Sequence, residues 1–224
     1  MRYFFRVEYD GTAYGGWQRQ PNAPSVQGTV EEAFGTVLRR QCPVTGAGRT
    51  DAGVHARAQG AHIDIDEQID PSACLRSVNS LLPWDIAVYD VRPAREDFHA
   101  RYSAISRSYR YTLTTRKSPL SGRYAWHISY AVDWELVRES MKALVGRHDF
   151  SSFCSSGSGA EHAVCAVDTV ELEQDGIRWE FRMKANRFVY KMVRSIVGTL
   201  VDVGRGKIGG SVGEILASRR RDRA

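Results

Sequence analysis

RYFFRVEYD (residues 2–10) opens the chain with a run typical of a β-strand, and the elements that follow it decide the fold. A polar loop rich in glycine leads into SVQGTVEEAFGTVL (residues 25–38), where apolar residues recur at helical spacing and Ser25 can cap a helix. A short strand, a strand near residues 57–65 and a second helix are expected next, with Asp70 as the cap of this helix and Pro71 in its first turn. The helix ends before Pro83, and a last strand is predicted at DIAVYDVRP (85–93). This order, β-α-β-β-α-β, is the ferredoxin-like pattern.

The second half of the chain repeats most of that order. SRSYRYTLTT (106–115) is rich in the aromatic and β-branched residues that favour strands. We expect a helix from Trp134 to Val145 behind an Asp133 cap, and an apolar helix at FVYKMVRSIVGTLVDVG (188–204). Two strands around a turn at residues 175–176 lie between these helices.

The last strand of this repeat has no counterpart in the sequence. The final residues, GRGKIGGSVGEILASRRRDRA (204–224), contain no alternating apolar run of strand length. A sheet without this strand would leave the edge of a neighbouring strand unpaired. We therefore expect the native protein to continue beyond Ala224 with a segment that pairs there, and SRRRDRA to lie in a mobile loop.

The fold class predicted from these patterns is α+β, with two ferredoxin-like (βαββαβ) halves at residues 1–95 and 96–224. The halves are expected to form one continuous, mainly antiparallel sheet, with helices on one face and a cleft on the other. GAGRTDAGVHA (46–56) lies between two strands of the first half. Because functional loops are usually carried on a rigid scaffold, this stretch is expected to line the cleft.

Composition narrows the class of protein only moderately. The chain has 224 residues, 42% hydrophobic and 25% charged, which is ordinary for a soluble globular protein. Its formal net charge of +5 favours polyanionic partners, although a solvated basic surface explains the charge about equally well. The four cysteines have no Cys-x-x-Cys spacing, so neither a zinc site nor a redox pair is indicated. Neither a signal peptide nor a membrane span is recognisable, and we expect a cytoplasmic protein.

Asp51 is the single acidic residue of GAGRTDAGVHA. The stretch lacks the third glycine of a dinucleotide-binding motif, and GRGKIGG (204–210) lacks the full pattern of a phosphate-binding loop. An aspartate in a glycine-rich loop is most often a turn residue, because its side chain readily accepts hydrogen bonds from nearby backbone amides. The local sequence alone therefore leaves its role open.

Five stretches taken together, in this order, resemble the TruA family of transfer-RNA pseudouridine synthases. The resemblance runs from about residue 3 to residue 207, and GRTDAGVHA is its most specific part. The stretches are YDGTAYGGWQRQ (9–20), SVQGTVEEAF (25–34), GAGRTDAGVHA (46–56), DFHARYSAISRSYRY (97–111) and NRFVYKMVRSIVGTLVDVGRGK (186–207).

The resemblance implies an isomerase that converts uridine to pseudouridine at positions 38–40, in the anticodon stem-loop of tRNA. It implies tRNA as partner, a homodimer, a target base flipped into a basic cleft, and neither a cofactor nor a metal. Asp51 matches the catalytic aspartate of the family. Whether its carboxylate attacks the sugar at C1′, attacks the base or removes a sugar proton is open.

Arg49 and Tyr109 match two further site residues of the family. Arg49 resembles an arginine that takes the place of the flipped base, and its alternative role is a salt bridge to Asp51 alone. Tyr109 is expected to stack on the uracil ring. As an aromatic residue on a strand it could equally belong to the core, and Tyr111, on the same face, shares this ambiguity.

Arg194 matches the arginine of the family's cleft. It falls at the margin of the apolar stripe of its helix, beside Tyr190, and Gly198 leaves space one turn later. That position favours a partly buried ion pair with Asp51, with an exposed surface arginine as the alternative. Arg187 departs from the family pattern, because a small residue is expected at that position.

Two other functions remain as alternatives to an isomerase. A non-catalytic RNA-binding module also fits two ferredoxin-like halves and a basic surface. Asp51 argues against it, since a carboxylate repels the RNA phosphates. A hydrolase with an aspartate nucleophile would need a second acid or base nearby, and the local sequence offers none.

Overall fold

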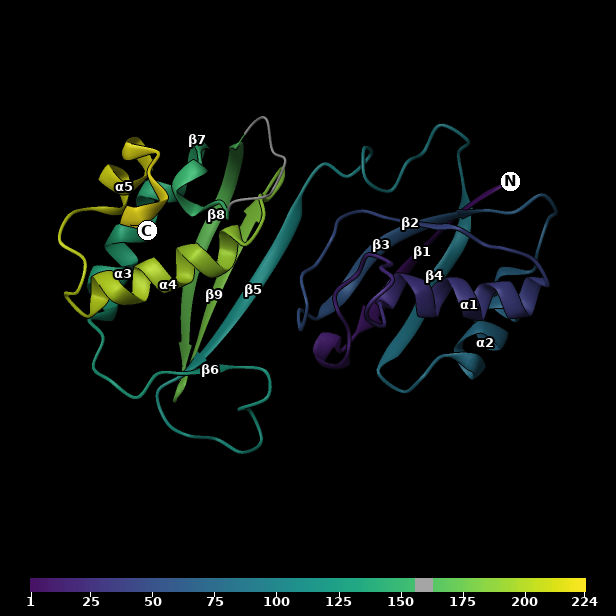
Figure 1. The fold of residues 1–224 in the computed structure, drawn as a ribbon, viewed down its shortest axis with the longest axis horizontal. Coiled ribbons are helices and arrows are strands. Elements are labelled where there is room, and N and C mark those ends of the chain that lie inside the picture. The colour runs from purple at the N-terminus through teal and green to yellow at the C-terminus, as the bar shows by residue number, and fades with distance from the viewer. Residues whose placement is uncertain (156–162) are drawn as a thin grey trace. The chain divides into compact units, whose positions relative to one another are not determined.

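The computed structural model of the chain describes residues 1–155 and 163–224. These residues form two units, Met1–Ile105 (unit 1) and Ser106–Ala224 (unit 2), and each unit is described by itself (Figure 1). Among the described residues, the longest helices have 13 residues, and no helix has the length and apolar character needed to cross a membrane.

Unit 1 has the element order predicted from the sequence. Its sheet has the strand order β2-β3-β1-β4, with every neighbouring pair antiparallel. One helix follows β1 and the other follows β3. The elements are β1 (Arg2–Tyr9), α1 (Val26–Leu38), β2 (Val44–Gly46), β3 (Ala56–Asp64), α2 (Pro71–Leu81) and β4 (Ile86–Ala94).

The predicted caps of both helices in unit 1 are confirmed. The side chain of Ser25 accepts a hydrogen bond from the amide of Gly28 at the start of α1. At the start of α2 the side chain of Asp70 accepts from the amide of Ser72. Each bond satisfies one of the backbone donors that a helix leaves unpaired at its amino-terminal end.

The core of unit 1 lies on one face of β1. Tyr3, Phe5, Val7 and Tyr9 alternate along this strand and are all buried, as expected for side chains that share one face of a strand. The ring of Phe5 lies 5.1 Å from that of Phe34 in α1, so the apolar face of the sheet packs against the helix.

Residues 96–105 belong to unit 1, beyond the boundary expected at residue 95. They pack on the other face of its sheet, where the ring of Phe98 meets that of Phe4 edge-on at 5.7 Å. The amide of Ala100 donates to Nδ1 of the buried His62, at 3.1 Å. These long-range contacts have no local signature in the sequence, which explains the displaced boundary.

Unit 2 contains a five-stranded sheet with the order β6-β5-β9-β8-β7. The β5 and β6 pair is parallel and the other pairs are antiparallel. The core packs α3 and α4 against this sheet, with the ring of Trp134 stacked at 4.1 Å on that of Trp179. The elements are β5 (Arg107–Thr114), β6 (Trp126–His127), α3 (Trp134–Met141), β7 (Gly146–Asp149), β8 (Val164–Asp175), β9 (Arg178–Ala185), α4 (Met192–Gly204) and α5 (Val212–Ser218).

Short 3-10 turns complete the structure at Gly11–Ala13, Lys142–Leu144, Ser151–Phe153 and Arg221–Arg223. The α-helical part of α3 therefore ends earlier than predicted, because its last turn tightens to 3-10 geometry. Helix α4 begins four residues after the start of the apolar run at residue 188.

The prediction of one continuous sheet is wrong, because the described strands form two sheets, one in each unit. One edge of β5 pairs with β9, and the other edge pairs with β6 at Leu113 and Thr114. The last strand expected from the repeat would pair with this second edge. In the described part of unit 2 no strand follows α4. Helix α5 comes next, and then a turn in which Arg221 donates to the carbonyl of Cys154.

Candidate active site

Asp51 lies in the loop of residues 47–55, which connects the end of β2 to the start of β3 in unit 1. We call this segment the Asp51 loop. Asp51 is the single acidic residue of the loop and is partly buried, whereas Arg49 is exposed. The predicted position of the motif between two strands is therefore confirmed.

Backbone hydrogen bonds hold the chain on both sides of Asp51. The carbonyl of Thr50 accepts from the amide of Trp17 at 3.1 Å, and the carbonyl of Asp51 accepts from the amide of Val54 at 3.1 Å. The hydroxyl of Thr50 also lies 2.8 Å from that of Tyr9, at the end of β1. These bonds fix the backbone from which the carboxylate projects.

Two glycines allow the segment after β1 to lie directly against the Asp51 loop. A Cβ on Gly16 would lie 2.5 Å from the carbonyl oxygen of Thr50, and one on Gly11 would lie 2.1 Å from that of Val54. Real Cβ atoms do not approach oxygen so closely. Gly16 also has a φ of +111°, a conformation that other residues rarely adopt. Residues 9–18, which we call the support segment, therefore supply the surface that shapes the loop.

Arg49 reaches back to the same support segment. Its Nε donates to Oε1 of Gln18 at 3.1 Å, while the residue as a whole stays exposed. This contact orients the side chain from its first guanidinium nitrogen and leaves the rest of the group at the surface. The role of Arg49 beside a flipped base stays a prediction.

His55, Asp10 and Tyr14 belong to the surroundings of the loop, and sequence reasoning did not select them. Nδ1 of His55 lies 3.0 Å from both the amide nitrogen of Gly11 and Oδ1 of Asp10. It accepts from the amide when this nitrogen carries no proton and donates to Asp10 when it does. Tyr14 accepts at its carbonyl from the amide of Gly53. All three residues lie within the stretches that carry the family resemblance, and this is the one feature of the sequence that could have indicated them.

Tyr109 lies in unit 2, on β5, and is partly buried against the core of that unit. Its ring contacts that of Phe188 edge-on, with centroids 4.7 Å apart. Tyr111 lies on the same face of the strand. Burial raises the pKa of Tyr111, and the positive charge of Arg194 acts in the opposite direction. The structure therefore brings this face of β5 near Arg194.

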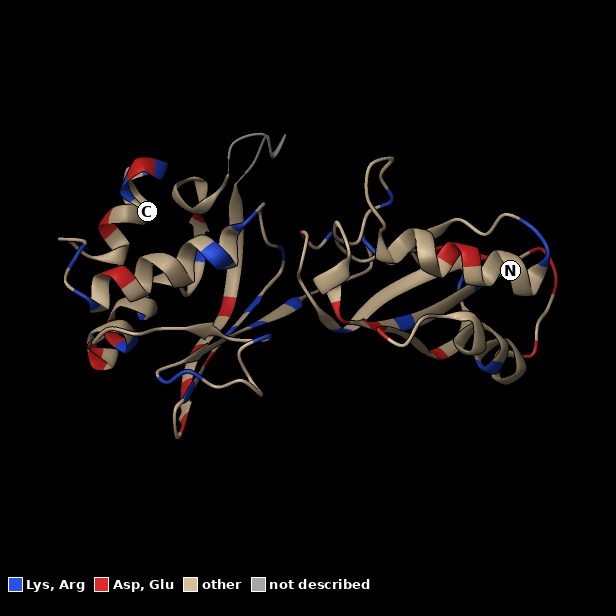
Figure 2. Ribbon diagram, turned by 60° about the horizontal axis from the view of Figure 1, so that its bottom comes forward, with Lys and Arg blue, Asp and Glu red and all other residues tan. Residues whose placement is uncertain are grey.

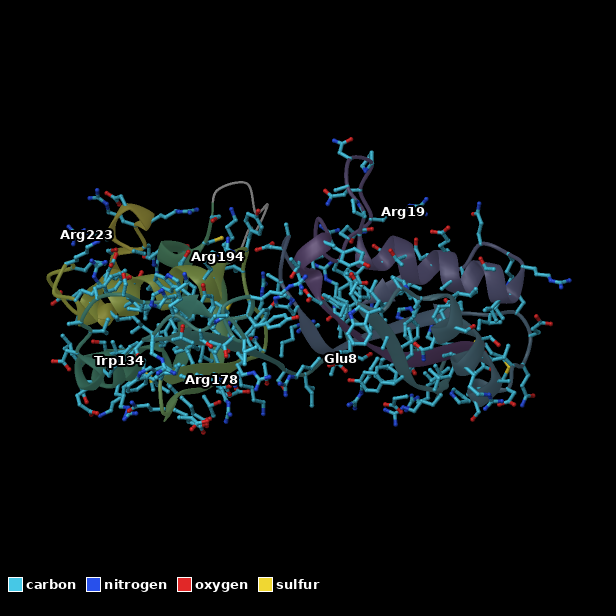
Figure 3. All side chains as sticks on the ribbon, turned by 90° about the horizontal axis from the view of Figure 1, so that it is seen from below. Glu8, Arg19, Trp134, Arg178, Arg194 and Arg223 are labelled. Carbon is cyan, nitrogen blue, oxygen red and sulfur yellow. The ribbon has the colours of Figure 1, made fainter. Side chains whose placement is uncertain are left out.

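Arg194 is the third residue of α4 and is exposed (Figure 3). It was expected to be partly buried. Its place at the margin of the apolar stripe accounts for the difference, because the neighbours Met192 and Val193 take the buried positions. A Cβ on Gly198 would meet nothing within 4 Å, so the predicted space one turn along is confirmed.

The four predicted site residues thus form two groups. Asp51 and Arg49 share one loop of unit 1, and Tyr109 and Arg194 belong to β5 and α4 of unit 2. Among the residues that the structure describes, no group of three or more His, Cys, Asp or Glu side chains could hold a metal ion.

Comparison with known proteins gives one family. A family model described as tRNA pseudouridine synthase matches residues 6–103 and 141–224. The protein named tRNA pseudouridine synthase A from Bacteroides thetaiotaomicron is 43% identical over 93% of this chain and 78% of its own length. Proteins of the same name from Syntrophotalea carbinolica and Porphyromonas gingivalis are 44% and 42% identical. They cover 89% and 100% of this chain, and 80% and 90% of their own lengths.

Proposed function

This chain belongs to the tRNA pseudouridine synthase family, a family of isomerases. From this premise we propose that it converts uridine to pseudouridine in the anticodon stem-loop of tRNA, at positions 38–40. In this proposal Asp51 is the catalytic carboxylate. The observation that carries the assignment is the fixed loop around Asp51. Backbone hydrogen bonds from Trp17 and Val54 hold the chain on either side of Asp51, a partly buried residue.

A carboxylate in such a loop suits the chemistry of this isomerisation. The bond between uracil N1 and ribose C1′ must break, and the base must rejoin the sugar through C5. An aspartate is ordinarily ionised near neutral pH, so it can act as a nucleophile or stabilise positive charge on the sugar. A loop that does not need to reorganise makes either role more effective. Attack on C1′, attack on the base and removal of a sugar proton are all compatible with this geometry.

The other three residues have substrate-binding roles in the proposal. Arg49 occupies the space that the flipped base leaves, and its exposed guanidinium can stack on bases and bind phosphate. Tyr109 stacks on the uracil, as aromatic side chains do with unpaired bases. Arg194 adds positive charge to the substrate site.

The interpretation of each unit as a ferredoxin-like half, with a catalytic cleft opposite the helices, belongs to the same proposal. The order β-α-β-β-α-β and the arrangement β2-β3-β1-β4 in unit 1 support it. We also propose a homodimer, on the resemblance to the family. Sedimentation of the purified protein tests that part separately.

The assignment is tested with purified protein and unmodified tRNA, without added metal or nucleotide, by mapping pseudouridine. We expect wild-type protein to modify the anticodon stem-loop. Asp51→Asn should abolish the isomerisation while tRNA affinity stays within a few-fold, because the amide keeps the shape and loses the charge. Affinity should even rise slightly when a negative charge near phosphate is removed.

Arg49, which lies in the same loop as Asp51, provides a matched control. Arg49→Gln should weaken activity by impairing base flipping without setting the rate to zero. Substantial turnover by Asp51→Asn would contradict the catalytic role of Asp51. Tight tRNA binding by wild-type protein with no pseudouridine formed would favour the RNA-binding module instead.

A further inference from the structure

Trp84 lies outside every role assigned above, and its side chain is fully exposed, at 101%. It follows Pro83 in the connection between α2 and β4. By contrast, Tyr9, Tyr14 and Trp17, three aromatic residues near this end of the sheet, are buried. An indole left wholly in water gains nothing from folding, so stability does not explain its place.

The turn that carries Trp84 is rigid. The carbonyl of Pro83 accepts from the amide of Ile86 at 3.1 Å, which closes a turn with Trp84 and Asp85 at its two central positions. Asp85 is held twice more. Its carbonyl accepts from the amide of Asp10 at 2.9 Å, and its carboxylate accepts from the hydroxyl of Tyr14 at 2.8 Å. The backbone that presents the indole is therefore fixed before any partner binds.

The same residues connect this turn to the Asp51 loop. The amide of Gly11 donates to His55, and the carbonyl of Tyr14 accepts from Gly53. In the sheet, the end of β1 at Tyr9 pairs with the start of β3 on one side and with the start of β4 on the other. Trp84 and Asp51 therefore lie at the same end of the sheet of unit 1, on segments joined through residues 10–14.

We propose that Trp84 is a base-stacking residue of the tRNA site, which holds an unpaired base next to the uridine being modified. The inference rests on the proposed function. Every base has a π face, and an indole presents a broad face on which a base can stack. Asp85 lies in the turn itself and its carbonyl accepts from the amide of Asp10, so two acidic residues lie at this position and disfavour phosphate. We therefore assign the contact to a base and not to the RNA backbone. A preorganised turn keeps the entropic cost of that contact small.

The test compares tRNA affinity and kinetics of full-length variants. Trp84→Ala should raise the Kd for tRNA about 5- to 150-fold, the range expected for the loss of one stacked base. Trp84→Phe should stay within about threefold of wild type, because a ring remains. The single-turnover rate at saturating tRNA should not change in either variant, since Trp84 binds and does not react. Leu120→Ala, at a residue 95% exposed in unit 2, is the matched control for loss of exposed apolar surface and should leave Kd unchanged.

Fluorescence gives a second reading. The chain has five tryptophans, and Trp84 is the most exposed among those that the structure describes. Saturating tRNA should protect wild-type protein from acrylamide quenching, and Trp84→Phe should lose most of this protection. A wild-type Kd for Trp84→Ala overturns the inference, as does an equal loss in Trp84→Phe and Trp84→Ala. A change in sedimentation without a change in tRNA affinity would also overturn it, because the partner would then be a second copy of the chain.

These outcomes separate the inference from the proposed function. If wild-type protein forms pseudouridine and Trp84→Ala binds tRNA normally, the stacking role fails and the function stands. If tRNA binding depends on Trp84 but no pseudouridine forms, the stacking role stands and the catalytic assignment fails.

Discussion

Gly16 and Gly176 both have positive φ, at +111° and +56°, yet an added methyl group would meet very different surroundings. At Gly176, in the turn between β8 and β9, it would meet nothing within 4 Å. At Gly16 it would collide with the carbonyl of Thr50, the residue before Asp51. The Asp51 loop thus has room for its backbone only because Gly16, 35 residues before Asp51 in the sequence, has no Cβ.

Gly16→Ala should therefore reduce kcat/KM for pseudouridine formation by about 100-fold, because displacement of a catalytic group by about 1 Å has effects of that size. Gly176→Ala also places a side chain at positive φ, within the left-handed α region that L-residues can adopt, and should destabilise the protein by about 1 kcal/mol with near-normal kcat/KM. Kinetics and thermal unfolding of the two variants provide the comparison. Equal activities would show that the support segment does not shape the Asp51 loop.

At the scale of single elements, β9 carries a buried carboxylate among arginines on the face away from the core. Basic and acidic residues are interspersed along the strands of unit 2 (Figure 2). Glu180 accepts from Arg178 at 2.9 Å, from Arg182 at 2.7 Å and from Arg110 at 3.3 Å. Burial raises the pKa of Glu180, but the hydrogen bond from Arg182 and the three positive charges outweigh it and hold the pKa below its usual value.

Glu180→Gln should lower the free energy of unfolding by about 1–3 kcal/mol at pH 7, because three arginines lose their shared acceptor. The pKa of Glu180 is lowered by folding, so its contribution is complete above its unfolded pKa of about 4.5 and disappears as pH falls through the folded value. Urea unfolding at pH 7 and pH 3 should show a large difference between variant and wild type that shrinks in acid. Glu173→Gln, at a side chain 57% exposed, should cost less than about 0.5 kcal/mol. A difference for Glu180→Gln that persists at pH 3 would refute this charge effect.

The elements predicted correctly are those with long periodic patterns and caps. β1 alternates buried and exposed residues, and α1 and α2 begin at the expected caps. β6 was missed because two residues cannot display a period, and β7 because GRHD contains no apolar residue. Both strands exist because a neighbouring strand offers its edge, which is a property of the assembled sheet.

For the whole molecule, the candidate site could be predicted only in part. The motif placed Asp51 in a loop between two strands, and this position is confirmed. The support of that loop by Gly16 and Trp17 could not be predicted, since hydrogen bonds between distant segments leave no local pattern. The sequence also placed residues 96–105 in the second half, although their contacts with Phe4 and His62 hold them in unit 1.

The hydrogen bond from the amide of Ala100 to His62 makes the position of residues 96–105, at the end of unit 1, sensitive to acid. Nδ1 of His62 can accept this bond only while it carries no proton. Burial, and then the charges of Arg2 and His99, lower the pKa of His62 below its usual 6.5. The neutral ring therefore contributes stability above about pH 6.5 that is lost as pH falls toward the pKa of the folded state, because the unfolded chain binds a proton that the folded chain does not bind.

Hydrogen exchange at the Ala100 amide, corrected for its intrinsic rate, should show falling protection between pH 7 and pH 5 in wild type. In His62→Gln, whose side-chain oxygen accepts at either pH, protection should stay level, and a parallel fall there would assign the effect to another group. Mild acidification is therefore expected to loosen the contact of residues 96–105 with the sheet of unit 1.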